Sequence, residues 1–578
     1  MNPKSQHKES PLKLKPFRPR IIDSLKGYNG GRFVKDLGAG LTVGVVALPL
    51  AMAFAIASGL EPQAGLFTAI IAGLIISLFG GSSVQIGGPA GAFIVVVLGI
   101  VNQYGVPTLI ISTLLAGILL FIMGWTGLGS LVRLIPVGIV IGFTNGIAVL
   151  IALSQIKDFL GLDFTSNSTH FFQRNWELVQ ALPTINVTAM LLASICLGFL
   201  FLWPKLFGKL AQTQPHNPFP KLLSSVPGSI LVLVFGTLAA YLLNLDVETI
   251  GSRFGEIPRS LPAFTFPVLQ LETAQNLIGP TLTIAFLCAI ESLLCARVAD
   301  GLTHQKHDPN QELMAQGLAN MASPLFGGMP ATGTIARTVT NVRSGGNSPI
   351  AGVVHALILL IVMLAAAPLA EHIPLAVLSA ILMFVAYNMG EWREFPKLKQ
   401  YHMVYRIIMV ATFLLTVVVD LTVAVEVGLI LAAVFFIYRV STLTEFTPMA
   451  LQAHEEERGI VARHIYGSLF FAVVGKIENM LQVPQTPKVL ILEMHQTISI
   501  DTTALECLQE LENDLRLRGG ILIFAGLNKQ AQSLFERSGF KAQLEPHQMQ
   551  ADFHAAMAQA MRLTTSAEKT QPITPSTL

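Results

Sequence analysis

The sequence predicts a polytopic α-helical membrane protein followed by a soluble α/β domain, and three observations lead to this fold class. Long apolar runs come first: between Leu37 and Ile156 the charged residues are Glu61 and Arg133 alone. Second, 12% of the 578 residues are charged, against ~25% in ordinary soluble domains. Third, surface charge returns abruptly after about residue 440, which indicates a separate domain outside the membrane.

Fourteen apolar segments can be placed along the membrane part, and several are too short to span a bilayer alone. Loop charges predict their orientation, because basic residues concentrate on the cytoplasmic side. The N-terminal tail and the linker 203–221 are basic, whereas the loops 157–186 and 244–275 carry a net negative charge. We therefore expect the protein in the plasma (inner) membrane, with both chain ends in the cytoplasm. The segments are expected near 37–58, 63–80, 88–103, 107–126, 134–155, 187–203, 223–243, 276–299, 312–325, 333–343, 348–368, 373–388, 404–420 and 422–440.

The chain is thus expected to have four parts. These are a cytoplasmic N-terminal segment (1–35), a membrane domain (36–440), a soluble domain (441–563) and a disordered tail rich in Thr, Ser and Pro (564–578). The net charge of +2 gives no case for nucleic acid as a partner. No nucleophile–base pair, phosphate loop or metal-type cysteine spacing is visible, so we predict neither an enzyme nor a metal or cofactor.

An internal repeat runs through the membrane part. The motif at 79–81 (Phe-Gly-Gly) recurs at 326–328, and Ala90 and Arg337 each lie eleven residues after its phenylalanine. Seven segments precede the second copy, so the two halves are expected to have opposite orientations in the membrane. Inverted repeats with short, Gly/Pro-interrupted helices are typical of transporters, whose substrate site lies at the interface between the repeats.

Short helices that begin near Ala90 and Thr334 are candidates for an anion site. A helix N-terminus presents unpaired N–H groups and a partial positive charge, and two such ends facing each other can hold an anion. Arg337 adds a permanent charge and a fork of donors that suits carboxylate, sulfate or bicarbonate. Alternatively, Arg337 serves folding alone by neutralising Glu291.

Glu291 lies in the middle of an apolar segment, where an ionisable group costs at least ~2.5–3.5 kcal/mol. It could pair with Arg337, ligate sodium or take up the proton that drives transport. Burial disfavours an ionised carboxylate and a nearby arginine favours it, so an anion bound beside Arg337 would promote protonation. Sodium requires clustered oxygen ligands, whereas Cys295 follows one helical turn later. We therefore favour a proton.

These features resemble the SulP family of anion transporters along nearly the whole chain. The resemblance implies fourteen helices in a seven-plus-seven inverted repeat, with a core domain that moves against a gate domain. It also implies an anion site between the third and tenth helices and a coupling acid on the eighth, which is Glu291 here. The motifs that carry it are 44–55 (GVVALPLAMAFA), 88–89 (GP), 316–320 (QGLAN) and 326–328 (FGG). The implied anion-binding residues are Phe54, Ala90, Gly333, Thr334, Ala336 and Arg337.

The resemblance also bears on substrate and coupling. Sodium-coupled bicarbonate members have Asp in place of Glu291, have Thr in place of Cys295 and lack Arg337. The residues around Glu291 are instead similar to those of a bacterial C4-dicarboxylic acid transporter of the family. We therefore expect proton-coupled symport of a C4-dicarboxylate or sulfate. A sodium-coupled bicarbonate symporter, an anion exchanger and an anion channel regulated by the soluble domain remain alternatives.

The soluble part is expected to contain a βαβ unit, with strands at 488–494 and 520–525 and a helix at 504–517. It resembles a STAS domain, whose phosphorylatable position falls on Thr503. The alternative is that Asp501 or Thr502 simply caps the helix. We expect the domain to support a homodimer, trafficking or regulation by a cytoplasmic protein partner.

Overall fold

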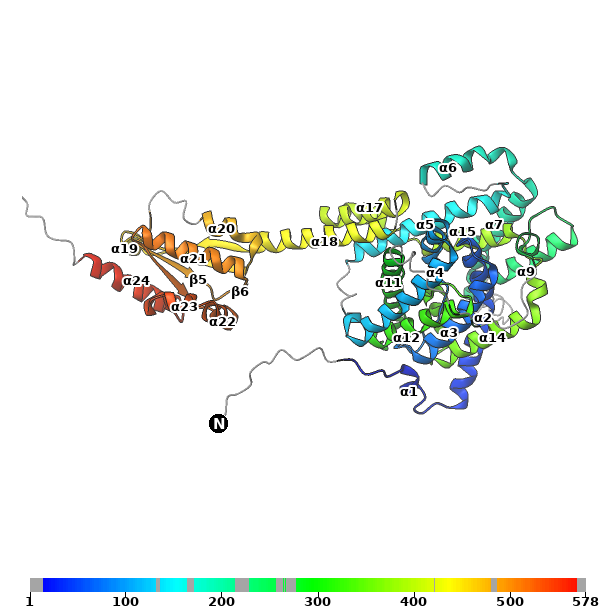
Figure 1. The fold of residues 1–578 in the computed structure, drawn as a ribbon, viewed down its shortest axis with the longest axis horizontal. Coiled ribbons are helices and arrows are strands. Elements are labelled where there is room, and N and C mark those ends of the chain that lie inside the picture. The colour runs from blue at the N-terminus through cyan, green and yellow to red at the C-terminus, as the bar shows by residue number, and fades with distance from the viewer. Residues whose placement is uncertain are drawn as a thin grey trace, which may run out of the picture. The chain divides into compact units, whose positions relative to one another are not determined.

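The computed structural model describes residues 14–130, 136–163, 171–213, 228–255, 264, 266, 277–419, 421–479 and 486–568. Contacts divide the chain into two compact units, residues 1–429 and 430–578. The boundary falls inside one helix, and each unit is described by itself below. Figure 1 labels the elements of both units.

The first unit is a helical bundle. Seven of its described helices, α18 included, are long and apolar enough to cross a membrane, and four shorter apolar helices accompany them. The bounds are α1 Arg20–Ser24, α2 Gly30–Ala57, α3 Pro62–Phe79, α4 Phe93–Trp125, α5 Val137–Leu160, α6 Phe171–Gln180, α7 Val187–Thr213, α9 Gly228–Leu242, α10 Ile250–Phe254, α11 Ile278–Thr303, α12 Pro309–Ala322, α13 Ile335–Arg343, α14 Ile350–Ala370, α15 Leu375–Met389, α16 Glu394–Lys397, α17 Met403–Val418 and α18 Leu421–Leu443, with strands β1 Gly87–Gly88 and β2 Thr332–Gly333.

Every apolar segment expected from the sequence coincides with a helix. The segments at 88–103 and 107–126 are joined in α4, which is kinked at Gly105 just before Pro107. Gly105 has φ 81°, a value that a residue with a side chain rarely adopts. The kink therefore falls where we placed a break between two segments.

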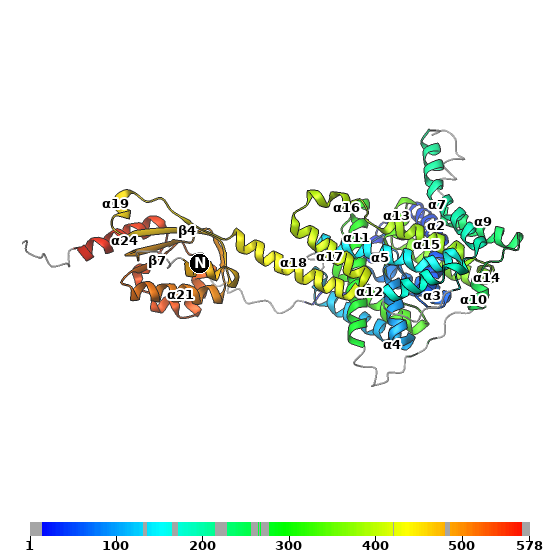
Figure 2. The same cartoon turned by 90° about the horizontal axis from the view of Figure 1, so that it is seen from above.

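Helices from each half of the bundle pack against helices of the other half. Helix α4 from the first half packs against α11 and α12 of the second, whereas α14 from the second half packs against α2 and α3 of the first. Backbones approach closely where α4 crosses α12, because a Cβ atom on Gly117 or Gly317 would lie 2.6 Å from the opposing backbone. Such small-residue contacts are typical of membrane helices. Figure 2 shows the same bundle from above.

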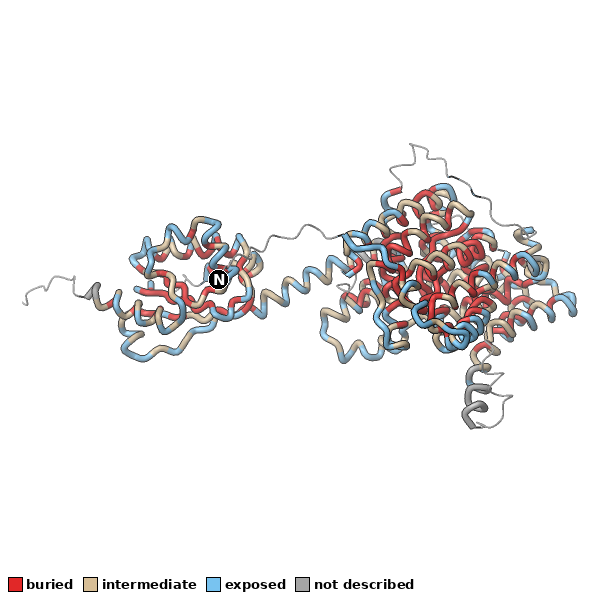
Figure 3. The backbone as a smooth tube through the Cα atoms, turned by 90° about the horizontal axis from the view of Figure 1, so that it is seen from below, coloured by how far each residue is buried: buried red, intermediate tan, exposed pale blue. Residues whose placement is uncertain are grey.

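Two short strands join the halves at the centre of the bundle. β1 and β2 pair antiparallel, with Gly87 opposite Gly333 and Gly88 opposite Thr332. Each strand comes directly before a helix, α4 or α13, that starts in the region where the sequence repeat places an anion site. Both strands are buried, and buried segments, red in Figure 3, gather in the interior of the bundle.

The second unit is a mixed sheet with helices on both faces. Its strand order is β3-β4-β5-β7-β8, with β6 paired to β4, and only β3 runs antiparallel to its neighbour. The expected βαβ unit is confirmed, because β5 and β7 pair in parallel and α21 connects them. The strands are β3 Glu445–Pro448, β4 Ile460–Leu469, β5 Val489–Glu493, β6 Thr497–Ile500, β7 Ile521–Ala525 and β8 Met549–Gln550. The helices are α19 Ala453–Glu456, α20 Val474–Glu478, α21 Thr502–Leu517, α22 Lys529–Arg537, α23 Phe540–Gln543 and α24 Phe553–Glu568.

Two details of this unit refine the expectations. Asp501 caps α21, since its carboxylate accepts a hydrogen bond of 2.8 Å from the Ala504 N–H, and Thr503 is exposed on the first turn. The final helix extends to Glu568, beyond the expected domain end at 563. Thr564 is buried there and donates to the Ala560 carbonyl, which explains why the helix continues. Residues 569–578, expected to be disordered, lie outside the described residues.

Candidate functional site

The start of α13 is fixed to the chain segment that precedes α4. Thr334 donates to the Ile86 carbonyl through both its N–H (2.9 Å) and its hydroxyl (3.0 Å). In return the Ile86 N–H donates to the Thr338 hydroxyl at 3.0 Å. One turn further, the Asn341 amide donates to the Val84 carbonyl at 2.8 Å. These bonds, together with the β1–β2 pair, hold the starts of α4 and α13 in one place.

Both helix starts present backbone donors at this point. Phe93 and Ile94 are the first residues of α4 to donate within their own turn, to Ala90 and Gly91. In α13 the corresponding first donor is Thr338, which bonds to the Thr334 carbonyl. The N–H groups that precede these donors have no partner inside their own helices. The starts of α4 and α13 therefore both lie beside the β1–β2 pair, with the Thr334 N–H engaged by the Ile86 carbonyl, and an anion site at Ala90 and Thr334 stays a prediction.

Three further helices close over the start of α4. A Cβ atom on Gly91 would lie 3.4 Å from the Ile151 side chain, 3.6 Å from the Phe54 ring and 3.7 Å from the Met389 sulfur. These residues belong to α5, α2 and α15. Phe54, which the family resemblance assigns to the anion site, is 5% exposed and lies beside Gly91, the residue that follows Ala90. Apolar walls of this kind lower the local dielectric and strengthen charge interactions at the helix starts.

Arg337 lies in the first turn of α13 and is buried. Its side chain is 2% exposed, and neither Nη1 nor Nη2 has a hydrogen-bond partner among the described residues. A Cβ atom on Gly88 would lie 2.3 Å from Nη1, so the guanidinium contacts the β1 backbone. The neighbouring Ala336 is exposed. A buried charge without a partner is costly, so the guanidinium has a strong tendency to attract an anion.

Gly333 is the remaining expected member of the site, and the structure places it in the β1–β2 pair. Its Cβ position would lie 1.8 Å from Nε2 of Gln85, so a side chain there would displace that amide. Gln85 in turn donates to the Ser292 hydroxyl at 3.1 Å. Gly333 thus keeps the space in which Gln85 connects the site to α11.

Glu291 lies on α11 next to this connection and is half-buried. Helix α11 packs against α13, where the Cys295 thiol donates to the Thr338 hydroxyl at 3.2 Å. No salt bridge joins Glu291 to Arg337 in the described part of the chain, since both terminal nitrogens of the arginine lack a partner. The geometry therefore gives no support to a purely structural ion pair. Glu291 thus lies on a helix that packs against α13, and its binding of a proton or a cation stays a prediction.

A second buried carboxylate, Glu312, was missed by sequence reasoning. It accepts hydrogen bonds from the Gly81 N–H (2.9 Å), the Gln316 amide (2.9 Å) and the Ser292 hydroxyl (3.3 Å). These bonds tie α12 to the loop after α3 and to the residue next to Glu291. The available signal was an acidic residue at the edge of an apolar segment.

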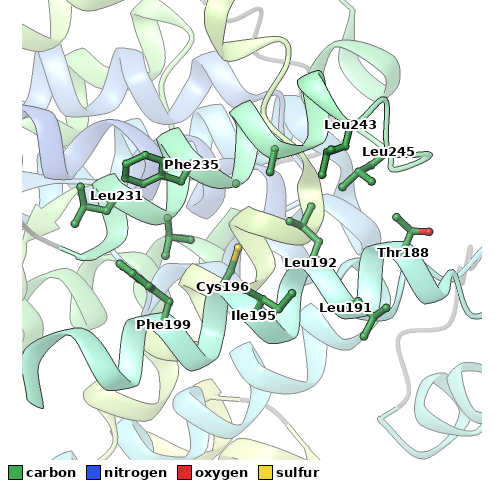
Figure 4. A pocket seen from close by; sticks show the side chains of 13 residues that line it. Thr188, Leu191, Leu192, Ile195, Cys196, Phe199, Leu231, Phe235, Leu243 and Leu245 are labelled. Carbon is green, nitrogen blue, oxygen red and sulfur yellow. The ribbon is translucent and has the colours of Figure 1, made fainter. Parts of the chain in front are cut away.

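The site is distinct from the cavity of about 450 Å³ in Figure 4, which lies between α7 and α9. The described residues that line this cavity are mainly Leu, Ile, Val and Phe, and none of them is charged. Such a cavity can accept hydrocarbon but offers nothing to neutralise an anion.

Replacing Gly88 with alanine tests the packing behind the site. Gly88 has φ 148°, which favours glycine, and the new methyl group would collide with Arg337. We expect anion binding to weaken about tenfold, equivalent to about 1.4 kcal/mol, as the guanidinium moves. Binding of labelled sulfate to the purified variant measures this. Gly99→Ala in α4 is the control, because nothing lies within 4 Å of its Cβ position. Equal affinity in both variants would show that this contact does not position Arg337.

Both protein-family models and individual proteins match this sequence. A family model described as the sulfate permease family matches residues 33–412, and a STAS domain model matches residues 452–556. The chain is 44% identical over 526 residues to the putative sulfate transporter YvdB of Bacillus subtilis (strain 168), which covers 90% of this chain and 96% of the relative. It is 32% identical over 417 residues to the bicarbonate transporter BicA of Picosynechococcus sp., which covers 71% of each chain.

Solved structures show the same fold. The overall structure of SLC26A9 aligns with a TM-score of 0.80 at 18% identity, covering 95% of this chain and 93% of that one. The transmembrane domain of a cyanobacterial BicA aligns with a TM-score of 0.59 at 32% identity, covering 69% of this chain and 98% of that one.

Proposed function

Because the chain belongs to the sulfate permease family of anion transporters, we propose that it is a secondary active transporter that carries a divalent anion together with a proton. Sulfate and C4-dicarboxylates are the proposed substrates. The observation that carries the proposal is the buried guanidinium of Arg337, whose terminal nitrogens have no partner among the described residues. It belongs to the first turn of α13 and contacts Gly88, which precedes α4.

The chemistry of the site favours a planar or tetrahedral oxyanion with two negative charges. A guanidinium offers two parallel donors to carboxylate or sulfate oxygens. Each helix start adds about half a positive charge, so the site as a whole presents more than one positive charge. The relative with 44% identity along nearly its whole length is named a putative sulfate transporter, which supports sulfate as the first anion to test.

Proton coupling follows from the position of Glu291 on α11, which packs against α13. With the site empty, the positive field of Arg337 opposes protonation of a nearby carboxylate. A bound anion offsets that field, so protonation becomes easier when the anion is present. By linkage, protonation must then strengthen anion binding by the same factor. The two ions consequently bind and cross together.

Sodium-coupled bicarbonate transport is the second candidate, and 32% identity to the bicarbonate transporter BicA supports bicarbonate as the anion. Against it stands the environment of Glu291, where the residue one turn later is Cys295 with its thiol bonded to Thr338. Sodium and other hard cations prefer oxygen ligands, and a thiol is a poor one.

We further propose that the protein resides in the plasma membrane with both termini in the cytoplasm. The soluble unit would then face the cytoplasm, where it supports a homodimer and binds a regulatory protein. Thr503 is the candidate phosphorylation site, because it is exposed on the first turn of α21. The Asp501 cap accounts for the local sequence without phosphorylation, so the two roles are separable by mutation.

Uptake into liposomes containing the purified protein tests the proposed function. We expect labelled sulfate to accumulate when the outside is acidic, with equal rates in sodium and potassium buffers. Succinate and bicarbonate, tested as competitors, rank the three substrates. Accumulation of bicarbonate that requires sodium and ignores the pH gradient would favour the second candidate. Uptake that never exceeds equilibrium would indicate a channel or an exchanger.

A further inference from the structure

A buried histidine lies close to the anion site, and neither the fold nor the proposed transport cycle has yet given it a role. His355 belongs to α14 and is 0% exposed. Neither ring nitrogen has a hydrogen-bond partner within the described ranges of the chain. Buried polar side-chain atoms are nearly always hydrogen-bonded to protein or to ordered water, so a histidine with two free nitrogens requires an explanation.

The imidazole lies against α3 and β1. A Cβ atom on Gly73 of α3 would lie 3.7 Å from Cε1 and 3.8 Å from Nδ1 of His355, and 3.2 Å from the Gly87 carbonyl oxygen. The imidazole therefore lies within ordinary contact distance of α3 at Gly73, and Gly73 itself faces the β1 backbone. A Cβ atom on Gly352, one turn earlier in α14, would lie 2.0 Å from the Ser77 hydroxyl, so the two helices approach closely here.

The Arg337 guanidinium contacts β1, which in turn packs on α3. The Gly88 Cβ position would be 2.3 Å from Nη1 of Arg337 and 3.4 Å from Cα of Ala69. Ala69 precedes Gly73 by one turn of α3, and Gly88 follows Gly87 in β1. Four buried nitrogen atoms that lack a described partner, two on each residue, are thus gathered around one turn of α3.

The two side chains are complementary as donor and acceptor. A guanidinium has donors only, whereas a neutral imidazole has one acceptor nitrogen and one donor. A neutral imidazole can therefore accept a hydrogen bond from the guanidinium. Of the helices that pack on α14, α3 contains no charged residue, and α2 carries Arg32, Lys35 and Asp36 only near its beginning.

We propose that His355 is a positioning residue of the anion site, which accepts a hydrogen bond from the Arg337 guanidinium through one water molecule. This inference rests on the proposed function, because it assigns His355 a role through Arg337. The bond holds the positive charge behind the starts of α4 and α13 when the anion leaves. The simpler alternative is that the ring only fills space between α14 and α3.

Three variants separate these roles by sulfate binding to the purified full-length protein. His355→Leu removes the acceptor but keeps an apolar group of similar volume, and we expect affinity to fall about 3- to 10-fold, as for loss of one hydrogen bond. His355→Gln keeps an acceptor and should bind sulfate within about twofold of wild type. His372→Leu, at an exposed histidine just after α14, is the control and should leave affinity unchanged.

The double variant decides between positioning and packing. In an Arg337→Ala background, His355→Leu should cause no further loss, because its effect acts through the arginine. Additive losses, or wild-type affinity in His355→Leu, would overturn the proposal. Wild-type affinity in Arg337→Ala would instead contradict the anion site itself, so the two failures are distinguishable. If size-exclusion profiles show that His355→Leu does not fold, His355→Met takes its place under the same criteria.

Discussion

Arg337→Ala is expected to weaken sulfate binding by roughly 10- to 150-fold in a protein that still folds. Charge-assisted hydrogen bonds of this type contribute ~1.5–3 kcal/mol. Removal of the side chain also removes a buried charge that has no partner among the described residues, so the folded state loses no ion pair. The variant should consequently be at least as stable as the wild type to heat, while its affinity falls. Sulfate titration of both proteins, with melting curves from the same samples, measures the two quantities.

Two further variants sharpen this result. Arg337→Lys keeps the charge but loses the planar fork, and its affinity should fall between those of the wild type and the alanine variant. Arg343→Ala removes an exposed arginine at the other end of the same helix and should bind sulfate normally. If Arg337→Ala binds sulfate as tightly as Arg343→Ala, the anion is held elsewhere.

Glu291→Gln is expected to abolish proton-driven accumulation while sulfate still binds and exchanges across the membrane. Glutamine resembles the protonated acid in shape and charge. A permanently neutral side chain cannot bind protons differently in the loaded and empty states, so the linkage between the two ions disappears. Accumulation driven by a pH gradient should fall to the level of empty liposomes, and exchange of labelled for unlabelled sulfate should continue.

Glu61→Gln is the matched control for this experiment, because Glu61 is an exposed carboxylate just before α3. It should accumulate sulfate as the wild type does. If accumulation persists in a well-folded Glu291→Gln protein, another group carries the proton. If wild-type uptake instead requires sodium, Glu291 acts as a cation ligand and the second candidate function gains support.

Much of the fold was predictable because segments that become buried or span a membrane are recognisable as apolar runs in the sequence. Each apolar segment became a helix, and even the break between 103 and 107 corresponds to a kink at Gly105. Glycines also mark a place where two backbones meet, because Gly87 pairs with Gly333 and Gly88 with Thr332 in the two strands. The βαβ unit of the STAS domain followed from its alternating strands and helix for the same reason.

The connections around the site could not be predicted, because they depend on contacts between distant parts of the chain. Glu312 bonds to Gly81, and Gln85 bonds to Ser292 on α11; each pair is separated by more than two hundred residues. His355 is a single polar residue in an otherwise apolar segment, a pattern that indicates neither depth nor neighbours. Only the packing of α14 on α3 places it near Arg337.

Movement of protons driven by sulfate tests the central claim most directly. Liposomes containing the protein and a pH-sensitive dye, in sodium-free buffer without a pH gradient, are given external sulfate. We predict that the interior acidifies as sulfate enters, and that liposomes with Glu291→Gln or Arg337→Ala show no such acidification. Sulfate entry without acidification, or acidification that persists in Glu291→Gln, would contradict proton-coupled transport through this site.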